Sequence, residues 1–186
     1  MTEQAATDPH QASPFANQIA LVSAPWPIFS RPSIQLGALK AWLKSEYPDL
    51  TVICYHSYLQ AALALGYPVY QAIAERGWTA ECVYAAMLYP DRADGMARLF
   101  DKSAKGQKAL AHADFTEIVR RVKRVTDAFI SRVNWAALDL AGVSVCLCQL
   151  TASLYFIREI RKNAPHLPII AGGAIIGGYS AKDLLG

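Results

Sequence analysis

The stretch DLAGVSVCLCQLTAS, residues 139–153, decides the fold, because an almost unbroken apolar run leads directly into small polar residues. The run covers residues 140–147, in which small side chains separate Val143, Val145 and Leu147. Such a run is typical of a strand covered on both faces, as in a parallel sheet. Ligands of open α/β sheets bind at the carboxyl ends of strands, so the polar residues that follow predict a ligand-facing loop.

Three polar residues, Gln149, Thr151 and Ser153, separate this strand from a helix predicted over residues 154–162. Two interpretations of Thr151 and Ser153 remain open at this point. Either they face a ligand, or they only cap the helix, as serine and threonine commonly do.

Upstream, residues 17–23 (NQIALVS) predict the first strand. It must end there, because Pro25 and Pro27 disfavour both a helix and a strand ladder. An apolar face predicts a helix over residues 33–47, and β-branched residues predict a second strand over residues 50–55. Strand, loop and helix therefore make the first half of a βαβ unit.

A long segment, residues 57–133, separates the second strand from the one at residue 140, and it is predicted to be a helical insertion. Apolar residues recur at helical intervals in four parts of it, residues 58–65, 69–88, 91–100 and 115–133. The last part is the clearest amphipathic helix. Its other side carries Arg120, Arg121, Lys123 and Arg124, which indicate a solvated face rather than a binding patch.

A fourth strand is predicted over residues 167–171, followed by glycines at 172, 173, 177 and 178. Glycine at a strand end lets a ligand approach the backbone closely, but this weak signal is also compatible with a bare turn. A helix is predicted over residues 179–185, but no further strand follows it. The expected fold is α/β, a Rossmann-like parallel sheet in a domain over residues 17–186 whose carboxyl end is truncated.

The composition favours a globular protein with a buried sheet, since 53% of the residues are hydrophobic and 18% are charged. A net charge of +3 does not call for a nucleic-acid partner. No apolar stretch reaches the roughly 18 residues that a membrane span needs. Residues 1–16 lack the pattern of a signal peptide and are predicted to be a disordered leader, so we expect a cytoplasmic protein with reduced cysteines.

Common catalytic and cofactor motifs are missing. The sequence contains neither GxGxxG nor a GKS or GKT phosphate loop. Cys146 and Cys148 would lie on one face of an extended strand, but no second pair completes a metal site, so packing is the favoured interpretation. Among the histidines only His56 follows a strand, at the expected ligand edge. The glycine-rich and small polar loops favour a large, flat, largely uncharged ligand.

Four pieces of the sequence together carry a resemblance to a known family. They are APWPIFSRPSIQLG (24–37), AERGW (74–78), VSVCLCQLTAS (143–153) and PIIAGG (168–173). In this combination and order the chain resembles the amino-terminal cobalamin-binding domain of radical SAM enzymes that mature ribosomally made peptides. The likeness extends over residues 17–186.

The resemblance implies a Rossmann-like sheet that holds cobalamin over a radical SAM barrel, and C-methylation of a precursor peptide. By position, the loop from Trp26 to Gln35 would approach the corrin, and the other polar residues would bind its amides or its nucleotide tail. The cofactor-binding residues so implied are Trp26, Arg31, Pro32, Ser33, Gln35, Ser144, Cys146, Gln149, Thr151, Ser153, Gly172 and Gly173.

Two departures from the broader cobalamin pattern are informative. The chain has no DxHxxG sequence, so a histidine ligand to cobalt from that motif is not expected. It also has no CxxxCxxC sequence, so S-adenosylmethionine and a [4Fe-4S] cluster are expected only in a separate radical SAM domain or subunit. We therefore do not expect this chain to be active alone.

Two alternatives remain. A non-catalytic interaction module would hold a precursor peptide or a partner enzyme through the helical insertion, and would predict an exposed apolar groove there with a filled strand edge. A redox protein would use Cys146 and Cys148 as exposed thiols of low pKa, which their apolar surroundings disfavour.

Overall fold

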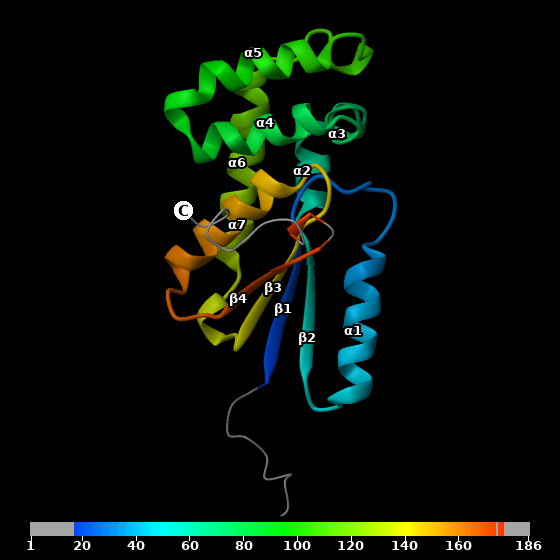
Figure 1. Ribbon diagram of the computed structural model, residues 1–186, viewed down its shortest axis with the longest axis vertical. Coiled ribbons are helices and arrows are strands. Elements are labelled where there is room, and N and C mark those ends of the chain that lie inside the picture. The colour runs from blue at the N-terminus through cyan, green and yellow to red at the C-terminus, as the bar shows by residue number, and fades with distance from the viewer. Residues whose placement is uncertain (1–16, 174, 177–186) are drawn as a thin grey trace, which may run out of the picture.

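The computed structural model describes residues 17–173, 175 and 176, and it shows a four-stranded, fully parallel sheet (Figure 1). The strands are β1 (Gln18–Ser23), β2 (Thr51–His56), β3 (Leu140–Ser144) and β4 (Ile169–Gly172), in the spatial order β2-β1-β3-β4. The sheet is Rossmann-like in its general kind. The expected leader, the helix over residues 179–185 and the glycines at 177 and 178 lie outside the described residues.

The strand at the centre of the prediction, β3, is shorter than expected. It ends at Ser144 rather than at residue 147, and helix α7 (Leu150–Asn163) begins four residues before the predicted start at residue 154. The apolar character of Val145 and Leu147 suggested a longer strand. However, Cys148 has a φ of 68°, which turns the chain out of the extended conformation.

The two faces of the sheet are covered very differently. On one face, helix α1 (Ile34–Glu46) lies over β1 and β2 and forms a small core of Ile19, Leu21, Leu36 and Val52. On the other face, α7 and the helices between β2 and β3 form the main core, which includes Ala20, Val22, Ala141 and Val143. Side chains alternate between the faces, as the strand period of two requires.

The segment between β2 and β3 is helical, and it extends well beyond the carboxyl end of the sheet (Figure 1). The helix predicted over residues 69–88 is in fact two helices, because the chain turns at Glu75 and Arg76. The α-helices are α2 (Tyr58–Leu65), α3 (Tyr67–Ala74), α4 (Gly77–Leu88), α5 (Ala93–Ala104) and α6 (Phe115–Arg132), and the 3-10 turns are η1 (Pro90–Arg92), η2 (Lys108–Leu110) and η3 (Trp135–Ala137).

Helix α6 confirms the amphipathic pattern. Asp114 caps it by accepting hydrogen bonds from the Thr116 and Glu117 amides, and Val122 on its apolar face is fully buried. The basic residues on the opposite side are exposed. Hydrogen bonds from Arg120 and Arg121 lower the pKa of Glu117 to about 2, so part of the basic run is paired within its own helix.

No helix in the described ranges has both the length and the apolarity needed to cross a bilayer.

Two hydroxyl groups that meet in the main core yield a first prediction. The Tyr84 hydroxyl of α4 and the Thr126 hydroxyl of α6 lie 2.7 Å apart. Changing Tyr84→Phe leaves Thr126 without this partner and should lower the free energy of unfolding by about 1–2 kcal/mol, measured by urea denaturation. The double change Tyr84→Phe and Thr126→Val should recover part of that loss. A double variant that adds the two single losses would contradict this account.

Candidate functional site

The carboxyl edge of the sheet is hollow where β1 and β3 lie side by side. Chain connections leave these two strands in opposite directions, β1 toward β2 and β3 toward β4, so this is the topological switch point of the sheet. A cavity of about 410 Å³ opens here between the loop after β1 and the turn after β3. Its walls are Ser23, Trp26, Pro27, Ile28, Arg31, Pro32, Ser33, Ile34, Gln35, Ser144, Cys146, Leu147 and Gln149.

A second cavity, of about 490 Å³, adjoins the first along the side of the sheet. It lies between α1 and the face of β3 and β4, and it is lined by Leu21, Gln35, Leu36, Leu39, Gly142, Val143, Ser144, Cys146, Ile170, Gly172 and Gly173. Both cavities share Gln35, Ser144 and Cys146. We therefore treat them as one continuous site and call it the edge cleft.

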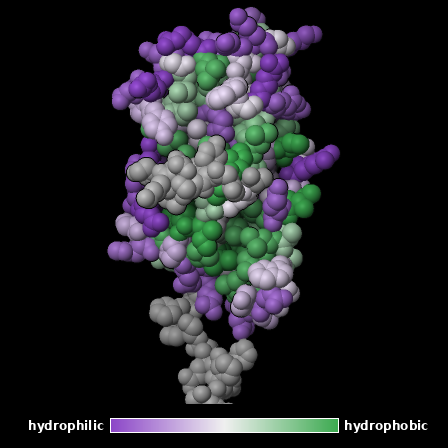
Figure 2. Space-filling view, viewed as in Figure 1, coloured by the Kyte–Doolittle hydropathy of each residue, from purple (hydrophilic) through white to green (hydrophobic). Residues whose placement is uncertain are grey.

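The side of the edge cleft is open because α1 does not extend over the last two strands. Ile170 of β4 is 58% exposed and Leu39 of α1 is 43% exposed, although both are apolar. Figure 2 shows the resulting hydrophobic surface over the strands beside α1. A parallel sheet is normally covered on both faces, so an open apolar face next to a hollow edge is a candidate binding surface.

Ten of the twelve predicted site residues line the edge cleft, and only two do not. Those ten come from three separate parts of the chain: the loop after β1 with the start of α1, the end of β3 with the turn that follows it, and the end of β4. Thr151 and Ser153 instead lie on α7, outside both cavities. Thr151 is bonded to Glu81 of α4, and Ser153 is 1% exposed with no hydrogen-bond partner for its hydroxyl among the described residues.

Gln149 is held by protein atoms. Its Nε2 donates to the Ala24 carbonyl at 2.6 Å, and its Oε1 accepts from the Cys146 amide at 3.1 Å. The side chain is buried and joins the turn after β3 to the end of β1. Its contribution to the edge cleft is thus to fix the shape of the wall, because both ends of its amide are already occupied.

Trp26 is almost fully buried, and most of its ring contacts protein atoms. It is 3% exposed, and its ring packs 5.1 Å from Tyr70 and 6.1 Å from Tyr84, measured between centroids. Its Nε1–H is buried and has no acceptor among the described residues. A buried donor without a partner is costly, so this group marks a position where a ligand or a water would be stabilised.

Cys146 lies where the two cavities meet. Its Sγ is 3.9 Å from the Gln35 Nε2 and 3.9 Å from the Ser144 Oγ. The expectation that Cys146 and Cys148 share one face is wrong, because the positive φ of Cys148 breaks the extended chain. Cys148 instead lies near Gly77 of α4, and burial raises the pKa of its thiol. The two thiols therefore do not form a redox pair facing one surface.

The two glycines at the end of β4 have different roles. A Cβ on Gly173 would lie 2.1 Å from the Val145 carbonyl oxygen, and its φ of 140° is strained for other residues. A Cβ on Gly172 would meet no described atom within 4 Å. Gly173 is therefore required by the close approach of two backbones, whereas Gly172 leaves space in the cleft.

Glu81 is a residue of the site region that sequence reasoning missed. Its Oε1 accepts from the Leu150 amide at 3.0 Å, and its Oε2 accepts from the Thr151 amide at 2.8 Å. It thus caps α7 from another helix, at the end of the turn that forms one wall of the edge cleft. The available signal was a single charge within the otherwise uncharged helix GWTAECVYAAML (77–88).

His56 and the described acidic, histidine and cysteine side chains do not form a further site at the edge cleft. His56 ends β2, as predicted, but it packs edge-on against Tyr58 and does not line the edge cleft. Within residues 17–173, 175 and 176, no three histidine, cysteine or acidic side chains are grouped closely enough to hold a metal ion.

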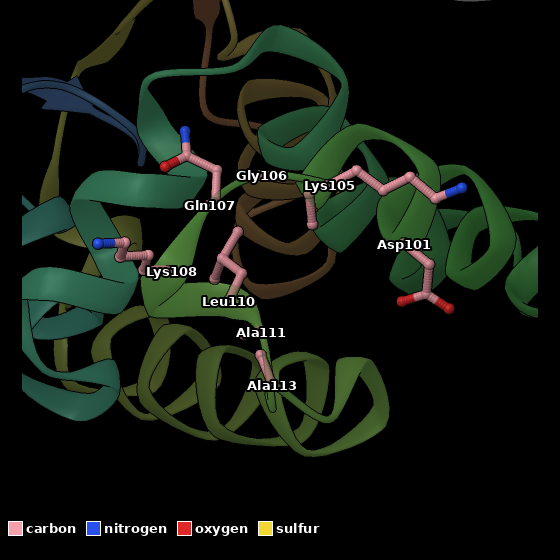
Figure 3. A pocket seen from close by; sticks show the side chains of 9 residues that line it. Asp101, Lys105, Gly106, Gln107, Lys108, Leu110, Ala111 and Ala113 are labelled. Atoms are coloured by element: carbon pink, nitrogen blue, oxygen red, sulfur yellow. The ribbon is translucent and has the colours of Figure 1, made fainter.

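A separate cavity of about 450 Å³ lies at the end of α5, beyond the sheet. Alanines, Gly106 and Leu110 form much of its wall, and the charged ends of Asp101, Lys105 and Lys108 point in different directions (Figure 3). Because its polar groups do not converge, it is a weaker candidate than the edge cleft.

The contrast between the glycines gives a second prediction. Gly173→Ala should destabilise the chain by at least about 2 kcal/mol, because the new methyl group overlaps the Val145 carbonyl. Gly172→Ala should change the free energy of unfolding by less than about 1 kcal/mol. Thermal and urea denaturation of the two variants measure both values. Equal destabilisation by the two changes would contradict the assignment.

Comparisons with protein-family models, with curated proteins and with solved structures found no significant match for this chain.

Proposed function

We propose that this chain is the cobalamin-binding domain of a radical SAM enzyme that C-methylates a ribosomally synthesised peptide. The observation that supports it most directly is the continuity of the edge cleft. A hollow at the switch point joins an open apolar face through Gln35, Ser144 and Cys146. The two parts, about 410 and 490 Å³, together offer room for a large ligand that both caps the strand ends and extends along the sheet.

The lining of the edge cleft fits the chemistry of cobalamin. Arg31 is the charged side chain of the lining, beside the neutral polar groups of Ser33, Gln35 and Ser144. The walls along the sheet are apolar, with Leu39 and Ile170 exposed. One cation, several neutral donors and apolar walls suit a ligand with a flat ring, amide arms, a single phosphodiester and an aromatic tail.

Within this proposal, the polar residues near the strand ends would hold the ring amides, and Gly172 would leave space for the tail. Bound cobalamin would supply the methyl group that is transferred to a carbon atom of the peptide. S-adenosylmethionine and a [4Fe-4S] cluster would belong to a separate radical SAM domain or subunit, since the sequence has no CxxxCxxC motif. The proposed partners are that domain and the precursor peptide, in the cytoplasm, with no role for nucleic acid or membrane.

A second candidate is an interaction module that binds a peptide or partner enzyme through the helices between β2 and β3. Its support is the exposure of large apolar side chains there, with Leu63 74% exposed on α2 and Trp78 66% exposed on α4. This candidate also requires a filled strand edge, whereas the edge in this chain is hollow. The hollow edge favours the cobalamin proposal.

The decisive experiment is an absorbance titration of the purified chain with hydroxocobalamin. Wild type should show a saturable spectral change, and Gly172→Leu should weaken binding at least about tenfold, which is about 1.4 kcal/mol, by filling the cleft. Gly37→Leu is the matched control, because a Cβ there also meets no described atom within 4 Å but Gly37 lies outside both cavities. If the folded wild type shows no change, or Gly172→Leu binds like wild type, the proposal fails.

Thiol labelling at pH 8 gives an independent test. Hydroxocobalamin should slow the alkylation of Cys146, which lines the edge cleft, as followed by mass spectrometry with fragment ions that separate Cys146 from Cys148. Cys82 should remain unlabelled with or without ligand, because burial and the nearby Glu81 charge raise its pKa to about 11 and keep it protonated. Equal labelling of Cys146 in the presence and absence of ligand would argue against this location.

A further inference from the structure

Helix α4 supports the turn that forms the wall of the edge cleft. The turn, residues 145–149, carries Cys146 and Leu147 into the cleft and continues directly into α7. Two residues of α4, one helical turn apart, face its end. Gly77 lies next to the Cys148 thiol, and the Glu81 carboxylate accepts the amides that open α7.

Glu81 contacts the start of α7 through hydrogen bonds besides those to the two amides. Its Oε2 also accepts from the Thr151 hydroxyl at 2.6 Å, and that hydroxyl lies 2.9 Å from the Glu81 carbonyl oxygen. The carboxylate also faces the positive end of the α7 dipole, which strengthens the contact. Each group at the start of α7 that Glu81 reaches would otherwise lack a partner within its own helix.

Two contacts that do not involve α4 also hold the turn. The Val145 amide donates to the Gly172 carbonyl at 2.7 Å, and Gln149 bonds to Ala24. The turn is thus attached to β4, to the loop after β1, and to α4. The strained φ of Cys148 lies between these attachments, so the turn depends on them to keep its shape.

From this arrangement we infer that Glu81 is a positioning residue, which holds the turn in the conformation that presents Cys146 and Leu147 to the edge cleft. The inference deepens the proposed function, on which its consequence for cobalamin rests. The helices between β2 and β3 then have a role in ligand binding that does not require them to touch the ligand.

The test begins without a ligand. In Glu81→Ala the Leu150 and Thr151 amides should exchange with deuterium at least about tenfold faster, and the alkylation rate of Cys146 should change. Glu81→Gln keeps one acceptor oxygen and should lie between Glu81→Ala and wild type. Glu75→Ala is the control, because Glu75 is an exposed carboxylate bonded to Gln71 on α3. It should behave like wild type in every measurement.

The second arm is titration of the same variants with hydroxocobalamin. Glu81→Ala should bind at least about fivefold more weakly and Glu81→Gln less so, in the order of their exchange rates. If exchange rises while Cys146 alkylation and affinity stay unchanged, Glu81 is merely structural and the inference is overturned. If wild type does not bind but Cys146 alkylation depends on Glu81, the proposed function fails and the positioning role stands.

A milder variant guards against loss of folding in Glu81→Ala. Thr151→Val removes the two hydroxyl contacts but keeps both amide bonds to the carboxylate. It should show the same effects in smaller measure. If Thr151→Val and Glu81→Gln, both folded, match wild type in Cys146 alkylation and in affinity, the inference is also overturned.

Discussion

The pairing of β1 with β3 is the constraint on which the rest of the structure depends. The two strands are far apart in the sequence, yet Gln18, the first residue of β1, and Asp139, the residue before β3, are joined by reciprocal bonds. The Gln18 amide donates to the Asp139 carboxylate at 2.8 Å, and the Asp139 amide donates to the Gln18 carbonyl at 2.9 Å. Because β1 also pairs with β2, the chain after β2 must cross to the far side of β1. That crossing creates the switch point, and with it the hollow edge where Ser23 and Ser144 lie side by side.

The same connection explains why the two faces of the sheet differ. Parallel neighbours are joined by right-handed crossovers, so α1 and the later helices must lie on opposite faces. Within the described residues, one face receives the helix α1, whose buried residue is Leu36, and the other receives the helical segment between β2 and β3 together with α7. The apolar surface beside α1 therefore follows from the order in which the strands are connected. The edge cleft combines this open face with the turn after β3, and helix α4 on the opposite face holds the end of that turn.

Much of the fold could be predicted from local patterns. The apolar runs located all four strands, and periodicity located α1, α2 and α6 within a few residues, since each has a strong local signal. The site was harder. Parallel strands bring their carboxyl ends to one edge, which is why the residues after β3 and Gly172 could be expected there, whereas Gln35 on α1 and Ser144 followed only from the resemblance. Two features were missed: β3 ends at Ser144, before the apolar run ends, and the capping of α7 by Glu81 is a tertiary contact with no local pattern.

The glycine in the middle of β3 has a consequence for how this protein can vary in evolution. A methyl group on Gly142 would lie 2.9 Å from the Leu21 Cδ2, and the two residues are direct neighbours across the strands. The leucine therefore occupies space that any side chain at position 142 would need. A side chain at position 142 would require the end of the Leu21 side chain to shift or become smaller, so under selection for a packed sheet the two positions should vary together. Because Leu21 and Gly142 both line the part of the edge cleft beside α1, such coupled substitutions would change its depth.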